Sequence, residues 1–261
     1  MRRTLFAAVA ALAVAVAGPV FAEDESEGGQ GHAAPELSAQ HWSFSGLFGT
    51  FDQAQLHRGF EVYNNVCAAC HSLRLVAYRN LSAVGLSEEE IRTLAAAKEV
   101  PGEPDDAGEP TTRPALPSDR IVPPFSNENA ARAANNGALP PDLSLIVKAR
   151  LGGADYIYSL LTGYTEPPAD FKLQEGLHYN AVFAGHQIAM PPPLNDGQVQ
   201  YADGTEATVD QMARDVTAFL AWAAEPELEA RKRLGVKVVL FLILLTAMLY
   251  AIKRKVWADV H

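Results

Sequence analysis

The residues best suited to chemistry lie in one short stretch, Cys67-Ala-Ala-Cys70-His71, which holds both cysteines of the 261-residue chain. Two thiols three residues apart can form thioethers with the two vinyl groups of one haem, and the adjacent histidine can then reach the iron. A thioredoxin-type redox pair and a zinc site are the alternatives. However, no strand–helix–strand pattern surrounds the cysteines, and no second cysteine pair completes a structural zinc site. The spacing therefore predicts one covalently bound haem c with His71 as an iron ligand.

The second axial ligand of the iron decides the chemistry. Met190 precedes three prolines, residues 191–193, which stiffen an extended loop. Such a loop can hold the Met190 thioether in a fixed position. Methionine would close the iron to small molecules and raise its reduction potential, which suits electron transfer. His186 is the rival and would give bis-histidine ligation. More remote candidates are His178, His57 and His41.

Two helices are expected to position these groups. Asp52 can cap a helix with one apolar face, which would carry the cysteines to the core. That face comprises Leu56, Phe60, Tyr63 and Cys67. A second helix opens with the capping box Thr208–Gln211 and places Met212 among apolar neighbours, so Met212 is predicted to be a core residue.

The N-terminal residues have the layout of a secretory signal peptide. Arg2 and Arg3 precede an apolar run over residues 5–17, and small residues lead to a cleavage site after Ala22. Residues 1–22 are therefore predicted to be removed on export.

Near the other end, residues 234–252 contain a single charge, Lys237, and are long enough to span the hydrocarbon core of a bilayer. Basic clusters at 231–233 and 253–255 flank this run. We therefore expect an exported haem domain over residues 23–230. Residues 231–261 would form a C-terminal transmembrane anchor with a short cytoplasmic tail.

The expected exported domain is strongly acidic. Residues 23–230 carry 12 basic and 30 acidic side chains, a net charge of −18, against −10 for the whole chain. Such a field repels nucleic acid and favours encounter with a basic protein.

Several longer segments resemble the cytochrome c1 family, which provides the haem subunit of the ubiquinol–cytochrome c oxidoreductase (the cytochrome bc complex). They are "RGFEVYNNVCAACHSL", "AARAANNGALPPDLSLIVKARLGGADYIYSLLTGY" and "AMPPPLNDGQVQYADGTEATVDQMARDVTAFLAWAAEPE". The resemblance implies covalent haem on Cys67 and Cys70, with His71 and Met190 as axial ligands. It also implies that four further residues line the haem: Asn135, Pro141, Arg150, near a propionate, and Tyr156.

The resemblance further implies a mostly α-helical c-type haem domain with long loop insertions and one C-terminal transmembrane helix. This subunit would take electrons from the Rieske iron–sulfur protein and pass them to a soluble basic cytochrome c. It would make or break no substrate bond on its own. It would lie beside cytochrome b in a dimeric complex of a bacterial inner membrane, with its haem domain in the periplasm.

Other functions for a haem domain remain open at this stage. They are an anchored electron carrier, the cytochrome c subunit of a terminal oxidase, and a haem peroxidase or sensor. Two local expectations complete the prediction. Residues 99–124, rich in proline and acidic residues, should form a long, poorly packed excursion. Asp142 should cap a short helix that ends at Gly152-Gly153.

Overall fold

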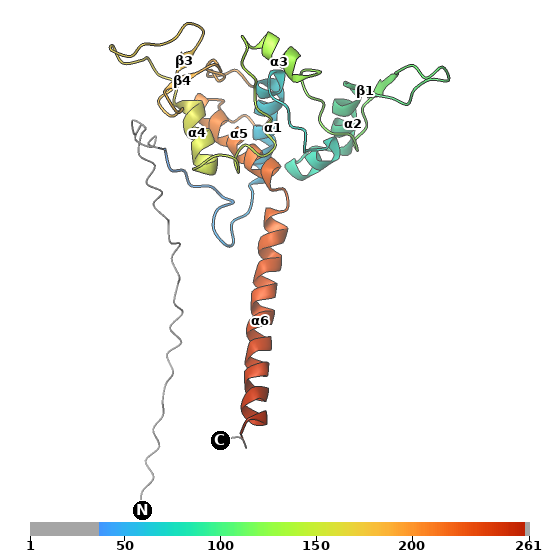
Figure 1. Cartoon of the computed structure of the whole chain (residues 1–261), viewed down its shortest axis with the longest axis vertical. Coiled ribbons are helices and arrows are strands. Elements are labelled where there is room, and N and C mark those ends of the chain that lie inside the picture. Colours follow the sequence, from blue (N-terminus) through green and yellow to red (C-terminus); the bar gives the residue numbers. More distant parts are fainter. Residues whose placement is uncertain (1–36, 259–261) are drawn as a thin grey trace, which may run out of the picture. The chain divides into compact units, whose positions relative to one another are not determined.

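The computed structural model describes residues 37–258 (Figure 1), so the predicted signal peptide over residues 1–22 lies outside the described residues. The α-helices are α1 (Gln53–Asn65), α2 (Glu88–Ala96), α3 (Glu128–Ala134), α4 (Gly153–Thr162), α5 (Val209–Ala224) and α6 (Leu228–Val256). Two 3-10 helices are η1 (Cys67–Ala69) and η2 (Tyr78–Val84). The strands are β1 (Glu99–Pro101) paired with β2 (Thr112–Pro114), and β3 (His178–Tyr179) paired with β4 (Gln187–Ile188), both antiparallel. The prediction of a mostly α-helical fold is confirmed.

Helix α1 forms as its sequence predicts. The Asp52 carboxylate accepts hydrogen bonds from the backbone N–H groups of Ala54 and Gln55, at 2.9 and 3.1 Å, and so satisfies donors that the first turn leaves free. Leu56, Phe60 and Tyr63 are all buried on one face. This face fixes the orientation of α1 and therefore of the Cys–His segment that follows it.

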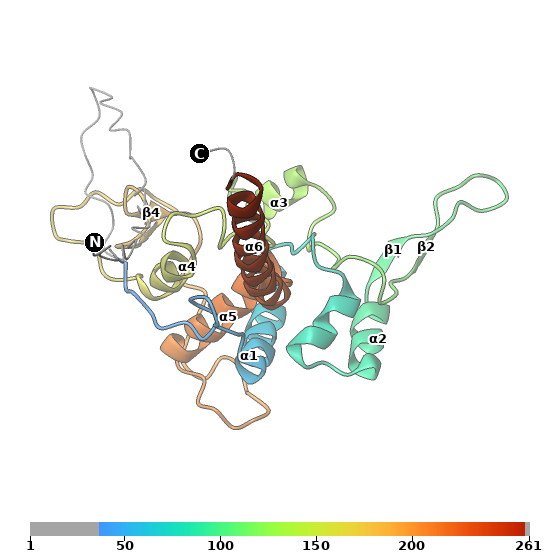
Figure 2. The ribbon, with the colours of Figure 1, turned by 90° about the horizontal axis from the view of Figure 1, so that it is seen from below.

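Helix α5 packs against α1, as both Figure 1 and Figure 2 show. The Phe219 ring lies 5.8 Å from the Phe60 ring and 5.6 Å from the Tyr63 ring, between centroids. The Thr208 hydroxyl accepts a hydrogen bond from the Gln211 N–H at the start of α5. Met212 is fully buried, which confirms its predicted role in the core.

A buried ion pair also joins the two helices. Arg58 of α1 donates from Nε to Asp215 of α5 at 2.9 Å and from Nη1 to Asp203 at 2.8 Å. The Asp215 side chain is fully buried, whereas Asp203 is exposed. Because burial of an unpaired carboxylate is costly, Arg58 makes the burial of Asp215 possible.

The segment over residues 99–124 is better ordered than its composition suggested. Strands β1 and β2 form a hairpin, and the Ala115 N–H donates to the Lys98 carbonyl at 2.8 Å. The Arg113 guanidinium forms two hydrogen bonds with the Asp119 carboxylate at 2.7 and 3.0 Å. Apart from Ala115, however, every residue of this stretch is exposed or only partly buried, so the segment is an excursion with little packing, as expected, although its backbone forms a hairpin.

Helix α6 is long and apolar enough to cross a membrane, by length and composition, and all but its first residue lie at the surface or only partly covered. Its first turns contact the chain just before α1. The Phe51 N–H donates to the Glu229 carboxylate at 2.9 Å, and the Lys232 ammonium donates to the carbonyls of Phe44 and Gly49 at 2.6 and 3.0 Å. These contacts join the first turns of α6 to residues 44–51.

Candidate haem site

The two cysteines and His71 lie on one tight turn directly after α1. The N–H groups of Cys70 and His71 both donate to the Cys67 carbonyl, at 3.1 and 2.8 Å. Neither cysteine forms a disulfide. Burial raises the pKa of the Cys67 thiol to about 12, whereas redox-active cysteines have a lowered thiol pKa. The turn therefore presents two free thiols and an imidazole together, and its electrostatics do not favour a thioredoxin-type pair.

The orientation of His71 is fixed by the backbone of Pro141. The Nδ1 atom lies 2.8 Å from the Pro141 carbonyl oxygen. Because a carbonyl only accepts hydrogen bonds, Nδ1 carries the proton and Nε2 keeps its lone pair. Burial lowers the pKa of the imidazole, although the Pro141 bond and nearby Asp142 oppose this, and the neutral form is favoured. A neutral imidazole with Nε2 free and Nδ1 held by a carbonyl is a typical metal ligand.

The segments around His71 and Pro141 are joined over several residues. The Leu143 N–H donates to the Ser72 carbonyl at 2.9 Å. The Asp142 carboxylate accepts from the Ser72 hydroxyl at 2.8 Å and from the Arg74 N–H at 2.9 Å. Burial alone would raise the pKa of Asp142, but its hydrogen bonds outweigh burial and lower it. An ionised Asp142 therefore holds the Pro141 carbonyl in place against His71.

The helix predicted to follow Asp142 is not formed. Residues 144–149 make a series of turns, and the next helix, α4, starts only at Gly153. Asp142 accepts from the Ser144 N–H at 2.9 Å, which is a local turn, while its other oxygen binds residues 72 and 74. The tertiary contact thus replaces the expected helix cap.

A small cavity brings further residues next to Cys70. It is lined in part by Ala131 of α3, by Leu139-Pro140 and by residues 123–125, which are Pro-Pro-Phe. Sequence reasoning missed residues 123–125, although an apolar, proline-rigid triplet after an acidic stretch is a recognisable signal. Asn135, predicted to line the haem, ends α3 and donates from Nδ2 to the Ala131 carbonyl at 2.7 Å.

Met190 lies in a loop that is attached to the end of α4. The Tyr164 hydroxyl donates to the Met190 carbonyl at 3.0 Å, and the Met190 side chain is partly buried. The rival ligand His186 stacks on Tyr179, with centroids 5.8 Å apart, and its Nδ1 lies 3.4 Å from the Asn180 carbonyl. His186 therefore has partners inside the loop itself.

Arg150 and Tyr156 are not bonded to the Cys–His turn. Arg150 is exposed and donates to the neighbouring Ala149 carbonyl, and Tyr156 is half-buried on α4. Over residues 37–258, no hydrogen bond joins either side chain to Cys67, Cys70 or His71. The structure thus brings His71 and Pro141 into direct contact, and the roles of Arg150 and Tyr156 stay predictions.

The residues present fit a covalently attached haem. Two free thiols and an imidazole with an available Nε2 share one turn, and a thioether stands on a proline-stiffened loop. The chain after Pro141 also exposes large apolar side chains, Leu145 at 47% and Leu151 at 95%, that an apolar ring could cover. Among residues 37–258, no group of three or more His, Cys, Asp or Glu side chains is arranged to hold a metal ion by itself.

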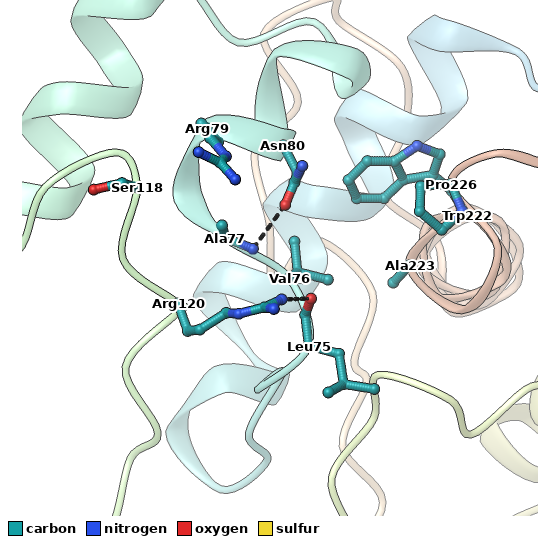
Figure 3. Close-up of a pocket in the computed structure, with 10 residues that line it drawn as sticks. All are labelled: Leu75, Val76, Ala77, Arg79, Asn80, Ser118, Arg120, Trp222, Ala223 and Pro226. Carbon is teal, nitrogen blue, oxygen red and sulfur yellow. Dashed lines mark hydrogen bonds between the residues drawn. The ribbon is translucent and has the colours of Figure 1, made fainter.

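A second, wider cavity lies elsewhere and contains none of the predicted haem residues. It is bounded by η2, the segment around Arg120 and the end of α5. Figure 3 shows Arg120 donating to the Leu75 carbonyl and Asn80 accepting from the Ala77 N–H. This cavity is therefore separate from the candidate haem site.

Comparison with known proteins agrees with the geometry of the Cys–His turn. The family model described as "Cytochrome C1 family" matches residues 42–260. The chain is 55% identical to "Cytochrome c1" of Rhodospirillum rubrum, over 86% of this chain and 88% of the relative. It is also 55% identical to "Cytochrome c1, heme protein, mitochondrial" of Saccharomyces cerevisiae, over 85% and 72%. "Cytochrome b-c1 complex catalytic subunit, mitochondrial" of Candida albicans is 52% identical, over 85% and 77%. The chain therefore belongs to the cytochrome c1 family.

Proposed function

We propose that this chain is the haem-carrying electron-transfer subunit of a cytochrome bc1 complex. The observation that carries the proposal is the Cys67–His71 turn, in which two free thiols stand beside an imidazole held at Nδ1 by the Pro141 carbonyl. Family membership supports it, because relatives bear the names "heme protein" and "b-c1 complex catalytic subunit". When bound, a haem c supplies a reversible one-electron iron couple.

Each predicted site residue has a distinct task. Cys67 and Cys70 would attach the group covalently, and His71 and Met190 would be its axial ligands. The Asp142 carboxylate keeps the Pro141 carbonyl against His71, so the imidazole cannot rotate away. Asn135, Arg150 and Tyr156 are proposed to line the haem, with Arg150 near a propionate.

The proposed partners follow from charge and from the complex named for the relatives. A Rieske iron–sulfur protein would donate the electron and a soluble basic cytochrome c would accept it, beside cytochrome b in a dimeric complex. The net charge of −18 over residues 23–230 would steer a basic acceptor toward this domain. The subunit would break no substrate bond itself and would serve the catalysis of the complex as an electron carrier.

We infer a bacterial inner-membrane location, with the haem domain in the periplasm and the C-terminus in the cytoplasm. The length and composition of α6 support the anchor, and the leader-like residues 1–22 support export. Attachment of a reporter enzyme after residue 261 tests the orientation, because the proposal requires it to be active only in the cytoplasm.

Absorption spectroscopy of the oxidised holoprotein tests the ligand set. Methionine-to-iron ligation gives a weak far-red charge-transfer band, which we expect in the wild-type protein and not in Met190→Leu. His186→Gln is the matched control and should keep the band. A wild-type spectrum without the band, or a Met190→Leu variant that keeps it, would contradict the proposed axial pair.

Two further measurements test the assignment to the complex. Mild detergent extraction should co-purify a b-type cytochrome and an iron–sulfur protein with the tagged chain, whereas a separate carrier or an oxidase subunit would not bring both. The rate of cytochrome c reduction should fall as salt rises, because screening weakens steering. A rate indifferent to ionic strength would contradict the electrostatic part of the proposal.

A further inference from the structure

The loop that contains Met190 is fastened to the end of α4 through one fully buried side chain. Asn180 donates from Nδ2 to the Leu160 carbonyl at 2.8 Å, and its Oδ1 accepts from the N–H groups of Val182 and Phe183 at 3.0 and 3.1 Å. The Asn180 N–H also donates to the His186 carbonyl at 3.1 Å. Both polar atoms of the Asn180 side chain therefore form hydrogen bonds, Nδ2 with α4 and Oδ1 with the loop itself.

The residue after α4 lets the loop approach closely. The Ala181 N–H donates to the Gly163 carbonyl at 2.9 Å. A Cβ at Gly163 would lie 2.7 Å from the Ser159 carbonyl oxygen and 2.9 Å from Cγ2 of Val182, both too short for ordinary contact. Only glycine allows this contact without a shift, so the backbone at residues 163–164 is held firmly against the start of the loop.

Tyr164, the next residue, reaches the other end of the same loop. Its backbone pairs with Asn180 in an isolated bridge, and its hydroxyl donates to the Met190 carbonyl at 3.0 Å. A tyrosine hydroxyl has an ordinary pKa of about 10, so at neutral pH it is protonated and can donate this bond. One side chain therefore spans the loop from its fixed start to Met190.

The residues after Met190 cannot supply such an anchor. Pro191, Pro192 and Pro193 have no backbone N–H, so none of them can donate a ladder or turn hydrogen bond. The Met190 carbonyl is therefore the last point before Leu194 at which the structure shows a hydrogen bond fixing this backbone to the segment after α4. The same arrangement occurs at the other predicted ligand, where the Tyr63 hydroxyl donates to the His71 carbonyl at 3.2 Å.

We propose that Tyr164 is the positioning residue for the axial methionine. Tyr164 lies two residues after the end of α4 and pairs with Asn180, and its hydroxyl holds the Met190 backbone so that the thioether stays on the iron. The proposal rests on the proposed function, since it requires Met190 to be a ligand. Tyr164 touches neither the iron nor an electron partner in this role. It acts only through the Met190 carbonyl.

The test uses the full-length holoprotein in detergent and the variant Tyr164→Phe, which removes one oxygen and keeps the ring. The far-red methionine–iron band and the far-UV circular dichroism are followed together on heating, and the midpoint potential is measured. Loss of one hydrogen bond should raise the population without methionine ligation about fivefold, equivalent to about 1 kcal/mol. The band should then disappear at a lower temperature than in the wild type, while the dichroism transition stays in place, and the potential should shift downward.

Tyr158→Phe is the matched control. Tyr158 lies on α4, close to Tyr164 in the chain, and its replacement also removes a hydroxyl, but the partners of that hydroxyl are Asp210 and Arg214 of α5 and not the loop. In this variant the band should be lost only together with the dichroism transition.

Each other outcome is decisive. A Tyr164→Phe band that survives to the wild-type temperature overturns the positioning role, as does a band that is lost only when the whole fold melts. In both cases, if Met190→Leu abolishes the far-red band, Met190 is still the iron ligand and the proposed function stands. A wild-type protein without the band overturns both the axial pair and the positioning role.

Discussion

Replacing Gly59 by alanine tests how closely α1 must approach α5 in order to place the Cys–His turn. Gly59 lies inside α1, opposite Asp215 and Phe219 of α5. A Cβ at this position would lie 2.1 Å from the Asp215 carbonyl oxygen and 2.7 Å from the Phe219 Cβ. Ordinary contact begins at 3.4 Å, so the two helices would have to separate locally by about 1.3 Å.

Two opposing effects set the magnitude. Alanine is the better helix former by about 1 kcal/mol, which would favour the variant. Overpacking in a tight core costs about 1–3 kcal/mol, and the upper end applies because a backbone oxygen cannot rotate away as a side chain can. The net expectation is a loss of about 2 kcal/mol, or a Tm lower by about 4–8 °C for a domain of this size.

Thermal unfolding of the holoprotein, followed by far-UV circular dichroism, measures this loss. Gly235→Ala is the control, because Gly235 also lies inside a helix but has no atom within 4 Å of an added Cβ. It should leave the Tm of the haem domain unchanged. A Gly59→Ala protein as stable as the wild type, or more stable, would refute the reasoning that contact across α1 and α5 limits this position.

Two further predictions concern charged side chains on α1. Arg58→Met should lower the free energy of unfolding in urea by about 3–5 kcal/mol, because it leaves Asp215 buried without its cation. The control is Arg92→Met on α2, which breaks an exposed pair with Glu88 and should lower it by about 0.5 kcal/mol or less. A similar loss in both variants would contradict the role given to burial. Burial raises the pKa of Glu61, with His57 opposing, and Glu61 Oε2 has no hydrogen-bond partner among the described residues. A carboxyl whose pKa is raised on folding disfavours the folded state once pH exceeds its unfolded value. Glu61→Gln should therefore stabilise the protein by about 1 kcal/mol at pH 7 and by nothing below about pH 4. Urea unfolding at the two pH values measures this, and a benefit that persists in acid would show that the carboxylate charge is not the cause.

Local sequence patterns predicted the elements whose causes are themselves local. The Asp52 cap, the apolar face of α1, the capping of α5 by Thr208 and the burial of Met212 all follow from residues within a few positions of one another. The length and composition of α6 were readable in the same way. The expectation that Asp142 caps a helix was wrong, and the β1–β2 hairpin within residues 99–124 was not predicted, because proline and acid content do not reveal partners such as Arg113 or the Arg74 backbone.

The kind of chemistry was predictable from one short stretch of residues. Five residues, Cys67 to His71, predict covalent haem attachment through their types and spacing, because the two thioether bonds and the histidine ligand would all come from this one stretch. What holds each predicted ligand in place depends instead on long-range packing. The Pro141 carbonyl on the His71 ring and the Tyr164 hydroxyl on the Met190 backbone come from segments 70 and 26 residues away. A hydrogen bond over such separations depends on how the helices and loops pack, so the short-range periodicity of the sequence does not predict it.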